Sequence, residues 1–131
     1  MENTQQAPVA MEHGQLPGSL ALAFLGDTLY DLYVRSRVVP GGGQVKKLHL
    51  AAAKLVNANA QSEALERVES ILSEEEADVV RRARNAKQSP PKHADPRAYH
   101  RATGFEALLG YLYLMGRVDR LDALMLLALP E

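Results

Sequence analysis

The hydrophobic positions along the 131-residue chain follow helical spacing. Between residues 19 and 37, and again between 105 and 114, apolar residues recur three and four positions apart and extend nearly all round the expected helices. No segment alternates between apolar and polar residues with a period of two, which is the pattern of a half-buried strand. The sequence therefore predicts an all-α helical bundle.

Capping and turn residues divide this pattern into successive helices. Pro40 and the run Gly41–Gly43 end the first helix, because proline and glycine interrupt helical backbone. Ser73 followed by Glu76 predicts a capping box. The other predicted helix-starting residues are Ser19, Asn57 and the pair Asp95–Pro96. The expected ranges are about 19–37, 44–56, 58–72, 74–86, 96–115 and 118–128.

The helices over 19–37 and 96–115 are expected to be packed neighbours, because a helix that is apolar on every side lies in the middle of a core. Gly26 lies in the first of them, and Gly104 and Gly110 lie in the other. Glycine in a helix costs up to about 1 kcal/mol relative to alanine. These glycines indicate the close approach of a helix backbone or a substrate, and ordinary core packing explains them equally well.

Composition adds limits to this picture. Hydrophobic residues make up 47% of the chain and charged residues 24%, as in an ordinary globular domain. The absence of cysteine excludes disulfides, zinc–thiolate sites and a thiol nucleophile. No apolar stretch approaches the roughly 20 residues of a membrane span, and the first 14 residues lack the basic and apolar blocks of a secretory signal. We expect a cytoplasmic protein with no membrane partner, a flexible lead over 1–17 and one domain over 18–131.

Charge is distributed unevenly. The net charge is −1, but residues 81–101 hold seven basic residues against the single acid Asp95, a local charge of +6. Such a segment favours contact with nucleic-acid phosphates. An alternative remains open, in which the basic residues are a solvated surface that complements the end of a helix dipole.

Two carboxylates stand in largely apolar helical stripes. Asp27 lies near the middle of one stripe in the first helix, and Glu106 has the equivalent place in the fifth. Neither helix offers a basic residue within one turn of its carboxylate. Either each acid is satisfied by a hydroxyl, a backbone N–H or a folded-back arginine, or the two share a Mg²⁺ ion, which prefers oxygen ligands.

The contexts of these two acids resemble a known family. Leu22–Asp27 is similar to the signature motif of ribonuclease III, and Phe105–Gly110 is similar to the second motif of that family. The resemblance extends to the short branch without a double-stranded-RNA-binding domain, Mini-ribonuclease III, and covers roughly residues 19–126. The stretches that carry this extension are Leu48–Ala52, Arg81–Lys87 and Tyr99–Tyr111.

The resemblance implies a ribonuclease III-like catalytic domain over 18–131 and a Mg²⁺-dependent endoribonuclease that cuts double-stranded RNA, leaving 5′-phosphate ends. Asp27 would be the principal catalytic and metal-binding residue, and Glu106 would be a second catalytic residue and metal ligand. The resemblance also implies a homodimer that matures the precursor of large-subunit (23S) ribosomal RNA.

Two positions depart from the full-length family. Ala23 and Thr103 stand where ribonuclease III proper has acidic residues, as expected for the short branch. The groups that replace those ligands, with Asp31 or a substrate phosphate as candidates, stay open.

In this light the basic segment is expected to bind the RNA backbone. The predicted RNA-binding residues are Arg81, Arg84, Asn85, Lys87 and Lys92. No pair of histidines has ligand spacing on one helix, and ordinary packing or RNA contact is expected for His49, His93 and His100. Two rival interpretations remain: a non-catalytic double-stranded-RNA-binding helical module, and a structural helical-bundle interaction protein.

Overall fold

The computed structural model describes residues 16–131, and the elements in this part of the chain are all helices. The α-helices are α1 (Ser19–Val38), α2 (Val45–Ala53), α3 (Ala58–Val68), α4 (Glu74–Arg84), α5 (Pro96–Leu114) and α6 (Val118–Ala128). Two short 3-10 helices, η2 (Val39–Gly41) and η3 (Glu69–Ile71), follow α1 and α3. The all-α prediction is confirmed. Most of the expected N-terminal lead lies outside the described residues, so the division at residue 17 stays a prediction.

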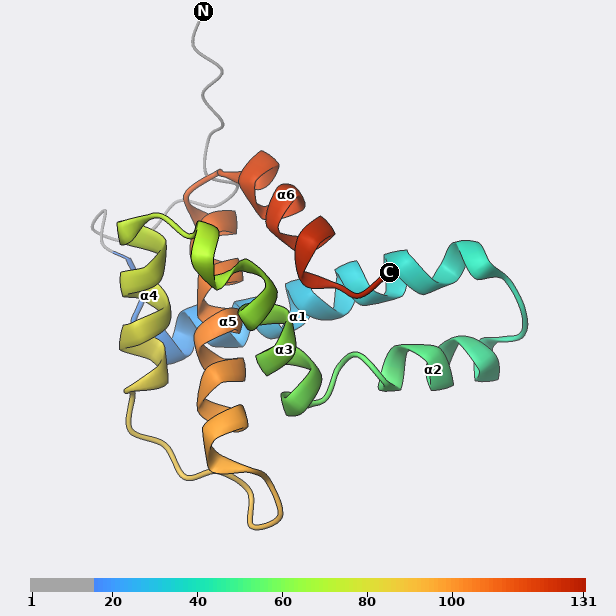
Figure 1. Ribbon diagram of the computed structural model, residues 1–131, viewed down its shortest axis with the longest axis horizontal. Coiled ribbons are helices and arrows are strands. Elements are labelled where there is room, and N and C mark those ends of the chain that lie inside the picture. The colour runs from blue at the N-terminus through green and yellow to red at the C-terminus, as the bar shows by residue number, and fades with distance from the viewer. Residues whose placement is uncertain (1–15) are drawn as a thin grey trace, which may run out of the picture.

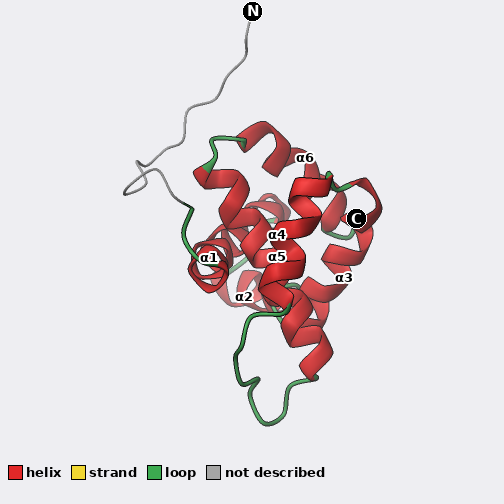
Figure 2. Ribbon diagram, turned by 90° about the vertical axis from the view of Figure 1, so that its left-hand side faces the viewer, coloured by secondary structure: helices red, strands yellow, loops and turns green. Residues whose placement is uncertain are grey.

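The helices are arranged around α5 (Figure 1). α3 and α4 lie on opposite sides of α5, α1 crosses behind it, and α6 lies beside α3. The C-terminal end of α1 and the whole of α2 extend to one side of the bundle as an arm, and Arg37 on α1 donates a hydrogen bond from this arm to the Pro130 carbonyl oxygen over 2.7 Å. Figure 2, which looks nearly along α1, shows the loop between α4 and α5 reaching away from the bundle. The arm and this loop flank the region where α1, α3 and α5 meet.

Most of the predicted helix starts are confirmed. The Asn57 side chain accepts a hydrogen bond from the Ala60 backbone N–H over 2.9 Å, and the Ser73–Glu76 capping box is complete. Asp95 caps α5, with its carboxylate accepting from the Arg97 N–H over 3.1 Å. The prediction for Ser19 is wrong: it is the first residue of α1, and Gly18 occupies the capping position without a side-chain bond.

Three helices end earlier than the hydrophobic pattern predicts. α2 stops at Ala53, where the Asn57 amide folds back to the Ala53 and Lys54 carbonyl oxygens at 3.4 Å each. α3 tightens into η3 after Val68, and α4 ends at Arg84. In each case local polar or 3-10 hydrogen bonding replaces the last helical turn, and the spacing of apolar residues does not report this.

The prediction that α1 and α5 are packed neighbours in the core is confirmed, with one correction. α5 is buried on nearly every side. α1 is buried on one face only, through Leu22, Leu29 and Tyr30, while Phe24 and Leu32 are 83% and 59% exposed. Complete burial of α1 was wrong because none of the residues from 16 to 131 packs over its outer face.

No helix within residues 16–131 combines the length and the apolar character needed to cross a lipid bilayer.

Candidate active site

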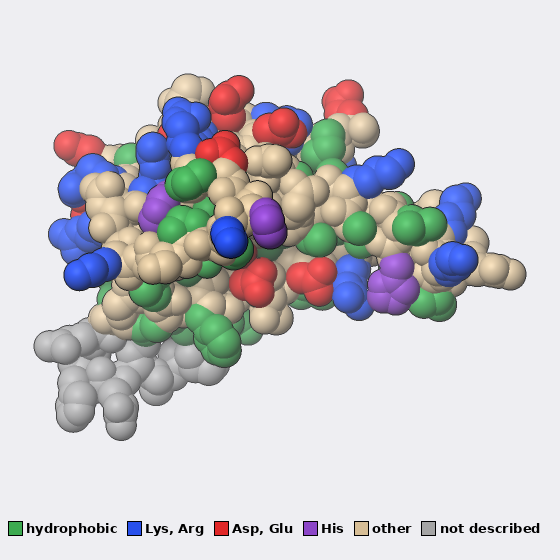
Figure 3. All heavy atoms as spheres, turned by 90° about the horizontal axis from the view of Figure 1, so that it is seen from below, with side chains coloured by type: hydrophobic (Ala, Val, Ile, Leu, Met, Phe, Trp, Pro, Cys, Tyr) green, Lys and Arg blue, Asp and Glu red, His purple; other side chains and the backbone are tan. Residues whose placement is uncertain are grey.

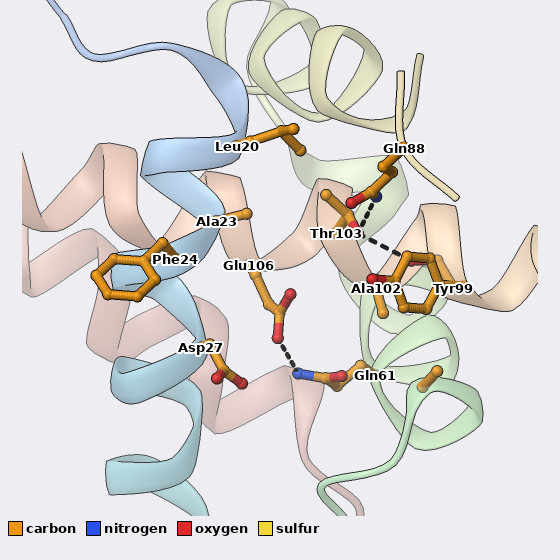
Figure 4. A pocket seen from close by; sticks show the side chains of 11 residues that line it. Leu20, Ala23, Phe24, Asp27, Gln61, Gln88, Tyr99, Ala102, Thr103 and Glu106 are labelled. Carbon is orange, nitrogen blue, oxygen red and sulfur yellow. Dashed lines mark hydrogen bonds between the residues drawn. The ribbon is translucent and has the colours of Figure 1, made fainter. Parts of the chain in front are cut away.

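A pocket of about 420 Å³ opens where α1, α3 and α5 meet, beside the loop between α4 and α5 (Figure 4). Apolar side chains form part of its wall, and carboxylate, amide and hydroxyl groups form the rest. The lining residues are Leu20, Ala23, Phe24, Asp27, Ala58, Gln61, Gln88, Tyr99, Ala102, Thr103 and Glu106. The structure therefore brings both carboxylates that the sequence singled out, Asp27 and Glu106, into one pocket.

Glu106 projects from α5 into this pocket. The helix around it is rigidly packed, because its chain neighbours Phe105 and Ala107 are completely buried, whereas Glu106 itself is half-buried. Gln61 on α3 donates a hydrogen bond from Nε2 to Glu106 Oε2 over 2.9 Å. The carboxylate lies between Gln61 and Asp27 (Figure 4), so its position relative to both is fixed by α5 and by the amide.

Asp27 faces Glu106 from α1, but it is exposed. Its predicted place within a buried stripe is therefore wrong. Leu20 and Phe24, which lie on the same side of α1, are 42% and 83% exposed. Leu20 and Phe24 thus form an uncovered apolar edge of the pocket, and the Asp27 carboxylate is open to an incoming ligand.

The two acids affect one another electrostatically. Burial raises the pKa of Glu106 to about 8; the Gln61 hydrogen bond opposes this rise, and the Asp27 carboxylate adds to it through a shared hydrogen bond and charge repulsion. Of the ion pairs within residues 16–131, none includes Asp27 or Glu106. A positive charge between the carboxylates would relieve this repulsion.

These residues fit a Mg²⁺ ion. Mg²⁺ is usually bound by one or two carboxylates, with waters and substrate phosphates as its other ligands. Asp27 and Glu106 supply two carboxylates from facing helices, and the pocket leaves room for the remaining ligands. No group of three or more acidic or histidine side chains within residues 16–131 is arranged to hold a metal ion, so the proposed site here consists of these two carboxylates.

The positions that lack the family's acids also line the pocket. Ala23 is buried, and Thr103 is buried with its hydroxyl donating to the Tyr99 carbonyl oxygen over 3.1 Å. Gln88 Nε2 donates to Thr103 Oγ1 over 2.8 Å. Asp31 is not among the lining residues and pairs instead with Arg35 at 3.1 Å, so it does not replace the missing acids at the pocket wall.

The predicted RNA-binding residues lie at the end of α4 and in the following loop. Arg81 forms an ion pair with Asp78 yet leaves 64% of its side chain exposed. Asn85 is exposed at the end of α4, and Lys87 and Lys92 are exposed in the loop. The stem of Arg84 lies against α5 at Gly104, so this side chain is partly committed to packing.

A second basic surface, formed by residues of the segment 32–62, was not predicted from the sequence. Residues 32–62 contain no acidic residue, and the basic residues among them are Arg35, Arg37, Lys46, Lys47 and Lys54. They lie on α1, on α2 and directly after α2, along the projecting arm. Figure 3, which views the molecule from below, shows Lys and Arg side chains near α4 and again along the arm. A count of acids over this stretch would have revealed the surface from the sequence.

His49, His93 and His100, the histidines within residues 16–131, do not line the pocket. His49 is exposed on α2, and His93 is exposed in the loop before α5. His100 is half-buried, with its ring edge-on to Tyr99, and its buried Nδ1 has no hydrogen-bond partner within residues 16–131.

Two glutamines in the pocket, Gln61 and Gln88, were not predicted from the sequence. Gln61 interrupts the buried stripe of α3 that includes Ala64, Leu65 and Val68. A polar residue in such a stripe was the available signal. Gln88 carried no signal, because its contact with Thr103 depends on how the loop folds back.

The chain is similar to known proteins over most of its length. Residues 20–117 match the ribonuclease III domain. The chain is 48% identical over 124 residues to Mini-ribonuclease 3 of Thermoanaerobacter sp., covering 92% of this chain and 85% of that protein. It is 50% identical over 105 residues to Mini-ribonuclease 3 of Symbiobacterium thermophilum, covering 79% and 81%. A crystal structure of a Fusobacterium nucleatum protein is similar with a TM-score of 0.76 and 30% identity, covering 82% of this chain and 88% of that one.

Proposed function

The chain belongs to the Mini-ribonuclease 3 branch of the ribonuclease III family and is an endoribonuclease; on this premise we propose that it hydrolyses double-stranded RNA in a Mg²⁺-dependent reaction. Asp27 and Glu106 are the proposed catalytic residues and metal ligands. The observation that carries the proposal is their position on two different helices, facing one another in a pocket open to solvent.

Each residue has a distinct part in this proposal. Asp27 provides an exposed carboxylate on α1 that is accessible to an incoming Mg²⁺ ion. Glu106 provides the more buried carboxylate on α5. When bound, Mg²⁺ supplies positive charge that polarises a phosphoryl oxygen and makes water a better nucleophile. Ala23 and Thr103 add no charge, which leaves the rest of the coordination shell to water and to phosphate oxygens of the substrate.

The basic surfaces favour duplex RNA as the ligand. Duplex RNA is recognised mainly through its shape, its phosphates and its 2′-hydroxyls. The α4 end with its loop and the projecting arm place exposed basic residues on both sides of the pocket. We assign phosphate contacts to Arg81, Arg84, Asn85, Lys87 and Lys92.

A homodimer is part of the proposal. Phe24 is 83% exposed and Leu20 is 42% exposed at the edge of the pocket. Large exposed apolar side chains that cluster on a surface mark interaction sites. A second copy that covers this face of α1 would place two pockets on one RNA duplex, so that each protomer cuts one strand.

By family resemblance, the proposed cellular reaction is cytoplasmic maturation of the large-subunit (23S) ribosomal RNA precursor. Its products would carry 5′-phosphate and 3′-hydroxyl ends.

The test is incubation of the purified protein with labelled duplex RNA in the presence of Mg²⁺, and in parallel with a chelator. We expect cleavage of the duplex with Mg²⁺ only, and product ends that an exonuclease specific for 5′-phosphates accepts. Binding without cleavage would favour the non-catalytic module, and neither binding nor cleavage would favour the structural interaction protein.

A further inference from the structure

Gln61 is a buried amide in the wall of the pocket. It is 5% exposed on α3, and Ala64, Leu65 and Val68 of the same buried stripe are completely buried. An amide in such a place costs free energy unless it is hydrogen-bonded, whereas an apolar residue would satisfy the packing without that cost. Core packing alone therefore does not account for a glutamine here.

The side-chain hydrogen bond of Gln61 is directed at the active site. Its Nε2 donates to Glu106 Oε2 over 2.9 Å. The terminal torsion of a glutamate side chain is otherwise broad, so a carboxylate without such a partner samples many orientations. Figure 4 shows the Glu106 carboxylate between Gln61 on one side and Asp27 on the other. The bond to Oε2 leaves Glu106 Oε1 without a glutamine partner.

The segment of α3 that carries Gln61 is itself fixed to α5. Arg101, five residues before Glu106 on α5, is 5% exposed. Its Nε donates to Ser62 Oγ over 2.9 Å, and its Nη2 donates to Glu69 Oε1 over 2.9 Å. Because Ser62 is the next residue after Gln61, these contacts hold the amide at a constant distance from Glu106.

We propose that Gln61 is a positioning residue for RNA cleavage, which holds the Glu106 carboxylate in the orientation that binds a divalent cation together with Asp27. The inference rests on the proposed function. Groups that hydrogen-bond to metal ligands typically contribute 10–100-fold to metal affinity or activity. Gln61 contacts Glu106 and needs no contact with the RNA, so its effect is on the metal and on turnover.

The test replaces Gln61 by methionine, which keeps an unbranched side chain of similar length but removes the donor. Mn²⁺ affinity of the RNA-free protein is measured by calorimetry, and Mg²⁺ dependence, kcat and KM are measured with duplex RNA. We expect Gln61→Met to weaken Mn²⁺ binding and to raise the half-saturating Mg²⁺ concentration by about tenfold or more. We expect a lower kcat and a KM for RNA within about twofold of the unmodified protein.

Gln88→Met is the matched control, because Gln88 lines the same pocket but bonds to Thr103. It is expected to keep the Mn²⁺ affinity of the unmodified protein. Thermal unfolding of both variants separates positioning from stability, and Gln61→Leu serves as a second apolar variant should the methionine variant fail to fold.

Unchanged Mn²⁺ affinity in a folded Gln61 variant would overturn the inference, even with a lowered melting temperature, because that result assigns Gln61 to packing. An unmodified protein that binds Mn²⁺ but leaves duplex RNA intact would refute the proposed function instead.

Discussion

At the scale of single residues, Glu106 is where burial and like charge oppose ionisation most directly. Its neighbours in α5 are completely buried, and the Asp27 carboxylate faces it. An acid that is harder to ionise in the folded state makes folding depend on pH. A cation bound between the two carboxylates would be attracted by both of them and would reduce their mutual repulsion.

Replacing Glu106 by glutamine is expected to remove a pH dependence of stability. In the folded protein the pKa of Glu106 is raised from 4.5 to about 8, so the folded state binds more protons than the unfolded chain between these values. In the absence of metal, the contribution of Glu106 to the free energy of unfolding therefore falls as pH rises from about 5 to about 8.

The measurement is urea unfolding of both proteins across this pH range with a chelator present. The difference between unmodified protein and Glu106→Gln isolates this group from others that titrate. A difference that does not vary between pH 5 and 8 would contradict the raised pKa of Glu106. Adding Mg²⁺ should stabilise the unmodified protein more at pH 8 than at pH 6.

The sequence was sufficient to predict which two acids share the pocket, because the motif context and helical spacing select Asp27 and Glu106. It was not sufficient to predict their different exposure. Periodicity reports which face of a helix is apolar, but α1 has two apolar sides and α5 covers only one of them. The place of Gln88 in the pocket could not be predicted, because its contact with Thr103 joins a loop to a helix.

At the scale of helices, the site depends on how closely α1 and α5 cross. A Cβ at Gly26 would lie 1.6 Å from the Glu106 carbonyl oxygen, and one at Gly110 would lie 2.1 Å from the Leu22 carbonyl oxygen. Each helix thus contacts the backbone of the other at a glycine. This crossing brings Asp27, the residue after Gly26, to the carboxylate of Glu106.

Gly26→Ala is expected to force the two backbones apart, because no side-chain rotation can relieve a clash with a carbonyl oxygen. Overpacking of this kind costs about 3 kcal/mol of unfolding free energy, at the upper end of the usual range. Gly41→Ala is the control, since nothing lies within 4 Å of its added Cβ, and its effect should stay within about 0.5 kcal/mol. Urea unfolding measures both, and equal stabilities for the two variants would refute the close crossing.

Helix existence was predictable here, because capping residues such as Asn57 and Asp95 stand at the starts of apolar stripes. The ends of the helices were less predictable. α3 gives way to a 3-10 turn at Glu69, whereas the apolar pattern continues to Leu72. The turn depends on backbone hydrogen bonding, which the side-chain pattern does not encode.

At the scale of the whole molecule, a net charge of −1 conceals two strongly basic segments, 32–62 and 81–101. The structure places one on the projecting arm and the other on the α4 end with its loop. Phosphate binding by such surfaces releases counterions and therefore weakens as salt increases.

Replacing Lys87 and Lys92 together by alanine is expected to weaken duplex RNA binding and to lower the slope of log affinity against log salt by about 2, roughly one unit for each phosphate that no longer meets a lysine. Both side chains are exposed, so stability should be unaffected. Fluorescence anisotropy over a salt series measures the slope. An unchanged slope would show that the two lysines do not contact RNA phosphates, so that the loop is not part of the RNA-binding surface.

The most direct test of the proposed site is cleavage of duplex RNA by Asp27→Asn beside the unmodified protein, with RNA binding and thermal unfolding measured on the same samples. Asparagine keeps the shape of the side chain, and Asp27 is exposed, so folding and RNA affinity should be retained. We expect a loss of cleavage of at least about a hundredfold at saturating Mg²⁺. Cleavage by Asp27→Asn at the rate of the unmodified protein would contradict the proposed catalytic role of Asp27.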